Sequence, residues 1–387
     1  MTNPGQSGRL LLALWVVAAS PGTAQQRGSV STWTVDPSPE VTIGQVDGPE
    51  EYLLTTVREG LLLDDGTIVV RNSIRDLFEL RYYDGSGQYL ATASRWGQGP
   101  FEFRRVLSVM HLPSDSVLVL GQDWRYSVFG SRGERIREGR FDEALTLGLN
   151  HDLIDGTHLG VEVAVLMPTQ DLGRQRHQRA YVIRDFAGAT DTVAVVDAER
   201  EYVYQDGQRR GSYGAPFGPT ALSAAGAGVF WLGSTDIPEI HGYDVDGRRV
   251  NTIRLETVPT PVSRADRNRW FDEVSARNPR ALRGAEELGF PDALPFWRGL
   301  EVDREGNVWV LRYDMPWAEG PQHWDVFNQR GVPVATVAVP QEVAPRCRVG
   351  LQTCLLGILD IGVDYLLVAG RGPFDVPQVR KHRLIKE

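Results

Sequence analysis

Lysine is almost absent from this chain, because Lys381 and Lys386 are its only lysines and arginine supplies every other basic side chain. Aspartate and glutamate number 50 against 41 lysines and arginines, which gives a formal net charge of −9. The arginines are spread along the sequence and form no basic stripe of the kind that a nucleic-acid-binding face requires. The composition therefore argues against a nucleic-acid partner. A GC-rich codon bias accounts for the arginine excess, and a surface that clamps phosphate or carboxylate groups is the alternative.

Long hydrophobic runs are equally scarce. The run LLLALWVVAA at residues 10–19 is shorter than the roughly 20 apolar residues that cross a bilayer. Arg9 precedes it and small residues follow it up to Ala24, which is the pattern of a secretory signal peptide. We therefore expect residues 1–24 to be removed. The remaining chain 25–387 is then an exported protein without a membrane span, in the periplasm or outside the cell, and an uncleaved anchor is the alternative.

Cysteine is also rare. Cys347 and Cys354 are the only two, and neither lies near the expected cleavage site, which disfavours a lipid-anchored lipoprotein. An oxidising compartment permits a disulfide between them. Such a bridge closes a short loop, so its entropic contribution is modest. Two free thiols are the alternative, and a metal site is disfavoured because no other cysteine or histidine lies nearby in the sequence.

Motifs of catalysis and cofactor binding are missing as well. The sequence contains no G-x-S-x-G elbow, no H-E-x-x-H, no Walker loop and no dinucleotide fingerprint after a strand. Among the histidines, only His151 and His158 have a metal-like spacing, and they flank a turn. The DVDG segment at residues 244–247 lacks the other ligands of a calcium loop. We therefore predict no cofactor, although a divalent cation such as calcium held by side chains from separate repeats stays open.

The sequence does contain a recurring motif. An apolar stretch runs into an Asp/Gly turn and a Val/Ile/Trp-rich strand follows, as in LLLDDGTIVV at residues 61–70 and LEVDREGNVWVL at residues 300–311. A period of roughly 40–50 residues with several short strands is typical of one four-stranded propeller blade per repeat. The repeats span residues 53–94, 105–145, 147–197, 217–257, 296–339 and from about 350 onward, and the third and sixth are weaker than the others.

The sixth repeat ends after three strands. Its missing strand has a source in TWTVDPSPEVTIG at residues 32–44, and we expect residues 35–43 to form the outermost strand of the last blade. The following GPEEY at residues 48–52 resembles GPFEF at residues 99–103, which follows the last strand of the first repeat. Pairing the two chain ends in this way closes the ring of sheets. A chance match is the alternative.

One insertion interrupts the β pattern. Residues 263–289 are rich in Ala, Arg and Glu, Ser263 is a suitable N-cap, and Trp270, Phe271 and Val274 fall at helical spacing. Pro279 divides the segment into two short helices. The insertion either caps the groove between two blades or forms a lid over the centre of the ring.

These repeats resemble six-bladed β-propellers of the NHL-like type in exported bacterial proteins. The turn G-x-G-P-x-E-F occurs at residues 97–103, and D-x-x-G-x-φ-W-V, where φ is an apolar residue, occurs at residues 303–310. The helical insertion followed by LPF at residues 294–296 is similar to uncharacterised members of that group. The resemblance implies an all-β fold, namely one six-bladed propeller domain over residues 25–387. The N-terminal strand would close the last blade, and the insertion would lie between the fourth and fifth blades.

Aromatic residues in Pro/Gly-rich segments are the candidate binding groups. Trp317 lies in MPWAEGP, and Tyr213 and Phe217 lie in GSYGAPFGP, where they could stack on a sugar or peptide. His241 and His323 lie beside apolar strand residues and could line a central channel. Because no catalytic constellation is present, we expect a monomeric, non-enzymatic propeller that binds a protein, peptide or glycan.

The alternative function is a metal-dependent hydrolase or lyase, similar to propeller lactonases. Its metal ligands would come from separate blades, so a motif search does not exclude them. Acidic or His/Asn side chains from four or more blades at the centre of the ring would favour this enzyme. An apolar or arginine-filled centre would argue against it.

Overall fold

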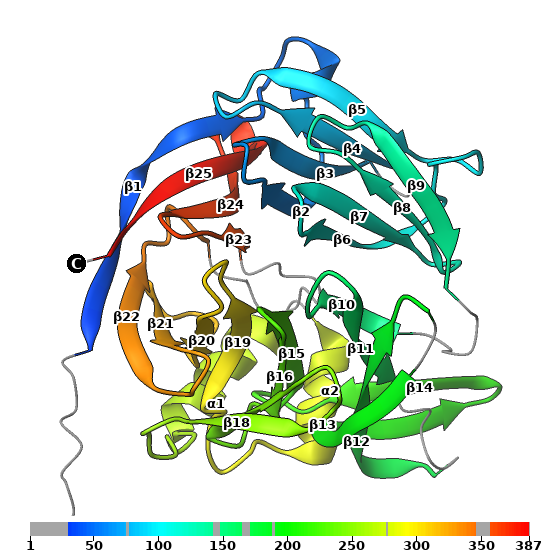
Figure 1. Ribbon diagram of the computed structural model, residues 1–387. Coiled ribbons are helices and arrows are strands. Elements are labelled where there is room, and N and C mark those ends of the chain that lie inside the picture. The colour runs from blue at the N-terminus through cyan, green and yellow to red at the C-terminus, as the bar shows by residue number, and fades with distance from the viewer. Residues whose placement is uncertain are drawn as a thin grey trace, which may run out of the picture.

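The computed structural model describes residues 30–74, 77–141, 148–164, 171–187, 190–275, 278–345 and 357–386. The expected signal peptide and both cysteines, Cys347 and Cys354, lie outside these ranges. The described chain is all-β apart from short helices, and its antiparallel sheets are arranged around a common centre (Figure 1). This is the propeller-like architecture that the repeats predict.

Three sheets have four strands in simple sequence order, as expected for propeller blades. The first contains β2 (Val57–Leu62), β3 (Ile68–Ile74), β4 (Leu77–Tyr83) and β5 (Tyr89–Arg95). The second contains β6 (Val106–Leu112), β7 (Ser116–Gly121), β8 (Arg125–Phe129) and β9 (Arg135–Arg140). The third contains β15 (Ala221–Gly226), β16 (Val229–Ser234), β17 (Glu239–Tyr243) and β18 (Arg249–Arg254).

The third repeat is larger than the sequence predicts. Its sheet has five strands, β10 (Gly148–Leu153), β11 (His158–Ala164), β12 (Gly173–Asp185), β13 (Thr190–Asp206) and β14 (Arg209–Gly214). An Arg/Gln-rich stretch, GRQRHQRA at residues 173–180, forms the first half of β12 and pairs with β13. This repeat therefore reaches residue 214 rather than about 197, and it ends in an additional strand.

The two chain ends meet in an eight-stranded sheet. In spatial order it contains β19 (Trp297–Val302), β20 (Val308–Arg312), β21 (Gln322–Phe327), β22 (Pro333–Val339), β1 (Ser31–Ile43), β25 (Pro377–Lys386), β24 (Tyr365–Arg371) and β23 (Ile358–Ile361). The N-terminal strand β1 pairs antiparallel with the C-terminal strand β25, which confirms the predicted closure. Its first four residues also pair in parallel with β22, a contact that the repeat pattern does not predict. Pro39 accompanies the register shifts in β1, since proline breaks a regular ladder.

The first strand of each repeat lies nearest the common centre. Successive first strands contact one another from β23 through β2, β6, β10 and β15 to β19 (Figure 1). We call these six strands the inner ring. Side chains from different repeats therefore approach one another here, although they are far apart in the sequence.

The hydrogen bonds of Asp303 explain why the Asp/Gly turn recurs. The Asp303 carboxylate accepts hydrogen bonds from the backbone N–H groups of Glu305 and Asn307 at 2.9 and 2.8 Å. It also accepts the indole N–H of Trp309 at 2.9 Å. One buried carboxylate thus closes the turn and orients the large side chain that follows. The D-x-x-G-x-φ-W motif therefore stabilises the turn and the position of the tryptophan.

Hydrophobic clusters fill the spaces between neighbouring sheets. One cluster joins Trp231 and Ile240 of one sheet to Trp297 and Val310 of the next, and comparable clusters lie between the other neighbours. Trp231, Trp297, Trp309 and Trp324 are fully buried. The tryptophans thus serve mainly as packing between sheets, whereas Trp96 is about half exposed.

The predicted helical insertion is present between β18 and β19. It contains α1 (Arg264–Trp270), a π-helical turn η2 (Phe271–Ser275) and α2 (Pro279–Leu288). Ser263 caps α1 in a reciprocal capping box with Asp266, and Pro279 begins α2. Short 3-10 helices η1 (Glu50–Tyr52) and η3 (Pro373–Asp375) complete the described elements. Helix α2 contacts β13 and β14 of the five-stranded sheet.

Candidate functional site

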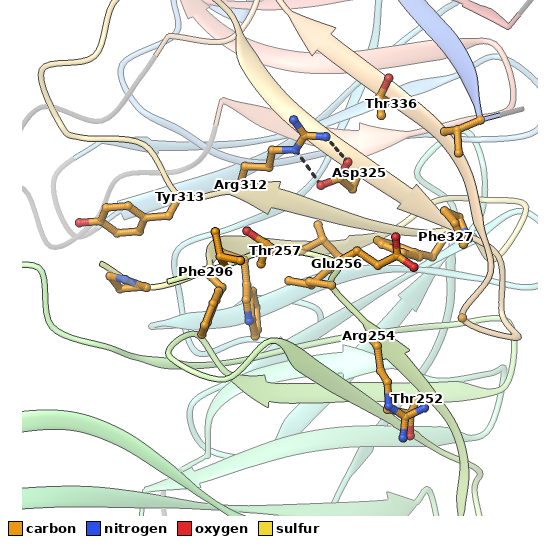
Figure 2. Close-up of a pocket in the computed structure, with 18 of the residues that line it drawn as sticks. Thr252, Arg254, Glu256, Thr257, Phe296, Arg312, Tyr313, Asp325, Phe327 and Thr336 are labelled. Carbon is orange, nitrogen blue, oxygen red and sulfur yellow. Dashed lines mark hydrogen bonds and ion pairs between the residues drawn. The ribbon is translucent and has the colours of Figure 1, made fainter. Parts of the chain in front are cut away.

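A groove of about 860 Å³ lies between the β15–β18 sheet and the strands β19–β22. Figure 2 shows the labelled side chains of this groove. Its apolar lining includes Leu255, Val258, Phe296, Val310 and Phe327. Val30, the residue that precedes β1, also lines it. The volume falls within the range of about 300–1,000 Å³ that is usual for ligand sites.

A glycine allows two backbone segments to lie in close contact at one end of this groove. Gly331 in the turn between β21 and β22 has a φ of 75°, and a Cβ atom there would lie only 2.5 Å from the carbonyl oxygen of Thr252. The turn therefore lies directly against strand β18, which only glycine permits. The distance between the two sheets at this end of the groove is set by this backbone contact.

Two of the three arginines that line the groove, Arg254 and Arg312, are paired with carboxylates. Arg312 donates two hydrogen bonds to Asp325 on the neighbouring strand, at 2.8 and 2.6 Å (Figure 2). Arg254 pairs with Glu239 at 3.0 Å. Burial raises the pKa of Tyr313, so its hydroxyl stays neutral and available for hydrogen bonding. The lining therefore offers apolar surface and a few satisfied polar groups, a combination that suits a ligand with little net charge.

A second candidate lies on the inner ring, where three carboxyl groups come from three different repeats: Asp152 on β10, Glu301 on β19 and Asp360 on β23. Asp360 accepts two hydrogen bonds from Arg304, at 3.1 and 2.8 Å, and is therefore neutralised. Asp152 accepts a hydrogen bond from the Ser223 hydroxyl at 3.0 Å. Within the described residues, Glu301 has neither a hydrogen-bond donor nor a cationic partner.

Burial shifts the protonation of these acids. It raises the pKa of Glu301 to about 8, and the charges of Asp152 and Asp360 contribute to the same shift. Burial also raises the pKa of Asp152 to about 6, which the Ser223 hydroxyl partly opposes. Glu301 is therefore mostly protonated at neutral pH. Groups perturbed in this way by burial and like charge often mark functional sites.

Asp64, His111 and Asp115 each offer a possible ligand atom, and these atoms lie within 4.8 Å of one another. Two observations weaken this set as a metal site. Asp115 already accepts the backbone N–H groups of Asp64 and Asp65. A guanidinium N–H of Arg304 hydrogen-bonds to Nδ1 of His111, and burial together with this positive charge lowers the pKa of His111. A cation here would be placed beside a fixed positive charge.

The structure brings two of the predicted binding residues together. Phe217 and Trp317 meet edge to face with ring centres 5.8 Å apart, and Phe217 also contacts Phe290. They belong to the hydrophobic cluster under the helical insertion, and Arg269 of α1 lies over Trp317 at 5.3 Å. Their immediate role is thus to seat the insertion, and their part in ligand binding stays a prediction.

The other predicted residues lie apart. Tyr213 belongs to strand β14 rather than to a loop, and its ring stacks on Tyr204 at 4.5 Å. His241 and His323 lie on β17 and β21, the third strands of their repeats, and so not on the inner ring. Burial lowers the pKa of His241, whereas His323 is exposed. Both remain predicted binding residues without a shared site.

Sequence reasoning missed the inner-ring acids. Asp152 lies in GLNHDL (β10) and Glu301 in WRGLEV (β19), and each is the single acid of its strand. Their only sequence signal is this acid on the first strand of a repeat, which becomes meaningful once the ring order is known.

Comparisons with known proteins support the fold alone. No protein-family model matches the chain, and no curated protein matches it. Among solved structures, a member of the DUF4221 family from Bacteroides vulgatus is similar, with a TM-score of 0.52 and 11% identity over 92% of this chain and 99% of that one. A protein described as exported from Bacteroides fragilis has a TM-score of 0.49 and 11% identity, over 93% of this chain and 96% of that one. A calcium-binding regucalcin from Agrobacterium tumefaciens has a TM-score of 0.37 and 11% identity, over 87% and 94%.

Among the described residues, no helix combines the length and apolar character needed to cross a membrane.

Proposed function

We propose that this chain is an exported, six-bladed propeller of the NHL-like type, in the periplasm or outside the cell, that binds a peptide or glycan without chemical conversion. The blade count rests on dividing the eight-stranded sheet where β1 meets β22, which leaves two groups of four strands. With the other four sheets, these groups make six units in one domain over residues 25–387.

The observation that carries the binding function is the groove of about 860 Å³ between the fourth and fifth units. Its apolar walls can bury the body of a ligand, and its backbone and hydroxyl groups can orient it. Since Arg312 and Asp325 are paired with each other, a strongly charged ligand gains little there. The groove therefore favours a neutral peptide or sugar chain.

The test is a binding screen of chain 25–387 against a peptide library and a glycan array. Val258 lines the groove and is 79% exposed, so Val258→Glu places a charge in the groove at little cost to folding. The matched control is Val46→Glu, at a residue 53% exposed and outside the groove lining. We expect ligands of the wild type to lose affinity for the first variant and to keep it for the second. Binding that neither change affects, or no binding to either collection, would reject the proposal.

A second function, a hydrolase or lyase that uses a divalent cation, is favoured by the inner-ring acids. Carboxylate oxygens suit a hard cation such as calcium. Among these three acids, Asp360 already pairs with Arg304. Asp152 and Glu301 are therefore the two of the three that have no cationic partner within the described residues. Bound calcium would polarise a substrate oxygen and would displace the proton of Glu301. Calorimetry in two buffers at pH 7 should then detect proton release that Glu301→Gln abolishes. Absence of calcium binding at millimolar concentration would remove this candidate.

A further inference from the structure

A smaller pocket of about 250 Å³ lies where the β12–β13 hairpin meets the end of α2. Arg174 and Arg176 of β12 and Arg200 of β13 form its basic side. Leu288 at the end of α2, with Gly289 and Phe290 after it, also lines the pocket. This site is distinct from the groove and from the inner ring, and it contains none of their residues.

The strand register concentrates positive charge in this pocket. Arg176 and Arg200 are direct partners across the antiparallel pair, and Arg174 precedes Arg176 by two residues. Because side chains alternate between the two faces of a strand, all three project from the same face of the hairpin. Like charges directly opposite each other destabilise a sheet. A negative charge beside the three arginines would therefore stabilise this face of the hairpin.

The protein supplies only part of that charge. Arg176 pairs with Asp236 at 2.8 Å and lies 3.4 Å from a carboxylate oxygen of Asp197. Arg174 donates a hydrogen bond at 2.9 Å to the carbonyl oxygen of Glu287, a neutral acceptor. The side chain of Arg200 has no hydrogen-bond or ionic partner within the described ranges. Arg174 and Arg200 thus lack an ion-pair partner within the described ranges, and the three arginines exceed the two neighbouring carboxylates by one charge.

The remaining lining is apolar and held in place by aromatic packing. Phe290 lines the pocket and contacts Phe217 with ring centres 5.7 Å apart, so the cluster under the helical insertion supports this wall. Pro219 and Pro291 add rigid apolar surface. An occupant would therefore meet both guanidinium groups and apolar carbon.

We propose that this pocket binds a small organic anion whose carboxylate or phosphate group lies between Arg174, Arg176 and Arg200. The planar guanidinium group matches both oxyanions in two-point hydrogen bonding. The bound anion would also relieve the repulsion between Arg176 and Arg200. This assigns part of the arginine excess of the sequence to a function that dispersed sequence positions conceal.

The experiment measures the thermal midpoint, Tm, of chain 25–387 with added sodium phosphate or sodium succinate, each compared with sodium chloride at equal ionic strength. Two variants are examined, Arg200→Gln and, as a matched control, Arg104→Gln at an exposed residue outside the pocket. We expect one of the two anions to raise the Tm saturably beyond the effect of chloride. Arg200→Gln should weaken this binding by about tenfold or more, and Arg104→Gln should leave it unchanged.

The two anions distinguish the ligand classes, since a response to phosphate alone indicates a phosphate ligand and a response to succinate alone a carboxylate. In chloride alone, Arg200→Gln should have a Tm equal to or above that of the wild type, because the change removes a like-charge pair. A purely structural Arg200 would lower the Tm instead. The proposal is overturned if neither anion exceeds chloride, or if Arg200→Gln responds to the anion as strongly as the wild type.

Discussion

Replacing Glu301 by glutamine should change how the stability of the protein depends on pH. Burial and the neighbouring charges raise the pKa of Glu301 from its ordinary value of 4.5 to about 8. Between these two values the folded chain keeps a proton that the unfolded chain releases. The free energy of unfolding of the wild type therefore falls as the pH rises through this interval. Glutamine carries no proton to lose, so the variant lacks this component.

The magnitude follows from the same two pKa values. The fall is about 1.4 kcal/mol per pH unit, or about 3 kcal/mol between pH 6 and pH 8. Because Glu301 is only partly buried, water screens some of this cost, and we expect about 2 kcal/mol. Asp152 titrates lower, near pH 6, so its contribution belongs mainly to the acid side of this window. Near pH 5 the two proteins should have similar stability, and above pH 8 the variant should be the more stable.

Urea unfolding at intervals from pH 5 to pH 9 provides the measurement, with the difference between variant and wild type as the quantity of interest. The other titrating groups are shared by the two proteins, so those that do not interact with Glu301 cancel in that difference. Glu319→Gln, at an exposed residue after β20, is the matched control and should give a constant difference. A Glu301→Gln difference that is equally constant over this range would refute the argument that this carboxyl group is protonated in the folded chain.

Three further changes test the packing. Trp33→Ala removes a buried side chain of β1 whose ring centre lies 5.9 Å from that of Trp309. Urea unfolding should show a free energy of unfolding lower by about 3–5 kcal/mol. A loss under about 1 kcal/mol would show that β1 does not hold the last sheet closed. Gly284→Ala should destabilise the protein although alanine favours helices, because its Cβ would lie 2.1 Å from the carbonyl oxygen of Gly214; a higher Tm would contradict the close contact of α2 with β14. Asp303→Ala should cost about 2–4 kcal/mol by leaving the Trp309 N–H unpaired, and Asp303→Asn should recover part of it; equal stability of both variants would contradict this role.

The repeated sheets were predictable because each repeat carries its own turn chemistry. Asp303 closes its turn through local hydrogen bonds, so the motif can be recognised without knowledge of the neighbouring sheet. The pairing of β1 with β25 was also predictable, since the sixth repeat lacked a strand. The parallel contact of β1 with β22 was not, because it depends on how two outer strands meet in space.

The extent of the third sheet could not be predicted from the sequence, for a different reason. The first half of β12 reads GRQRHQRA and shows no alternation of apolar and polar residues. It is held instead by pairing with β13 and by ion pairs such as that between Arg179 and Glu199. Hydrophobic periodicity identifies strands that have one apolar face. A pair of strands whose side chains are mostly polar gives no such signal.

The two departures from the repeat pattern meet at one place. The long β12–β13 hairpin with its extra strand β14 enlarges the third sheet, and the helical insertion follows the fourth. Helix α2 contacts β13 and β14, and the arginine pocket lies at this junction. A regular repeat needs neither addition to close its sheets, because the other four-stranded sheets pack without them. Arg200 has no ionic partner within the described ranges and lies directly opposite another arginine, an arrangement that contributes nothing to holding the sheet together. The anion that we propose for this pocket would give the arrangement a role, and the pocket is therefore where we expect ligand specificity to lie.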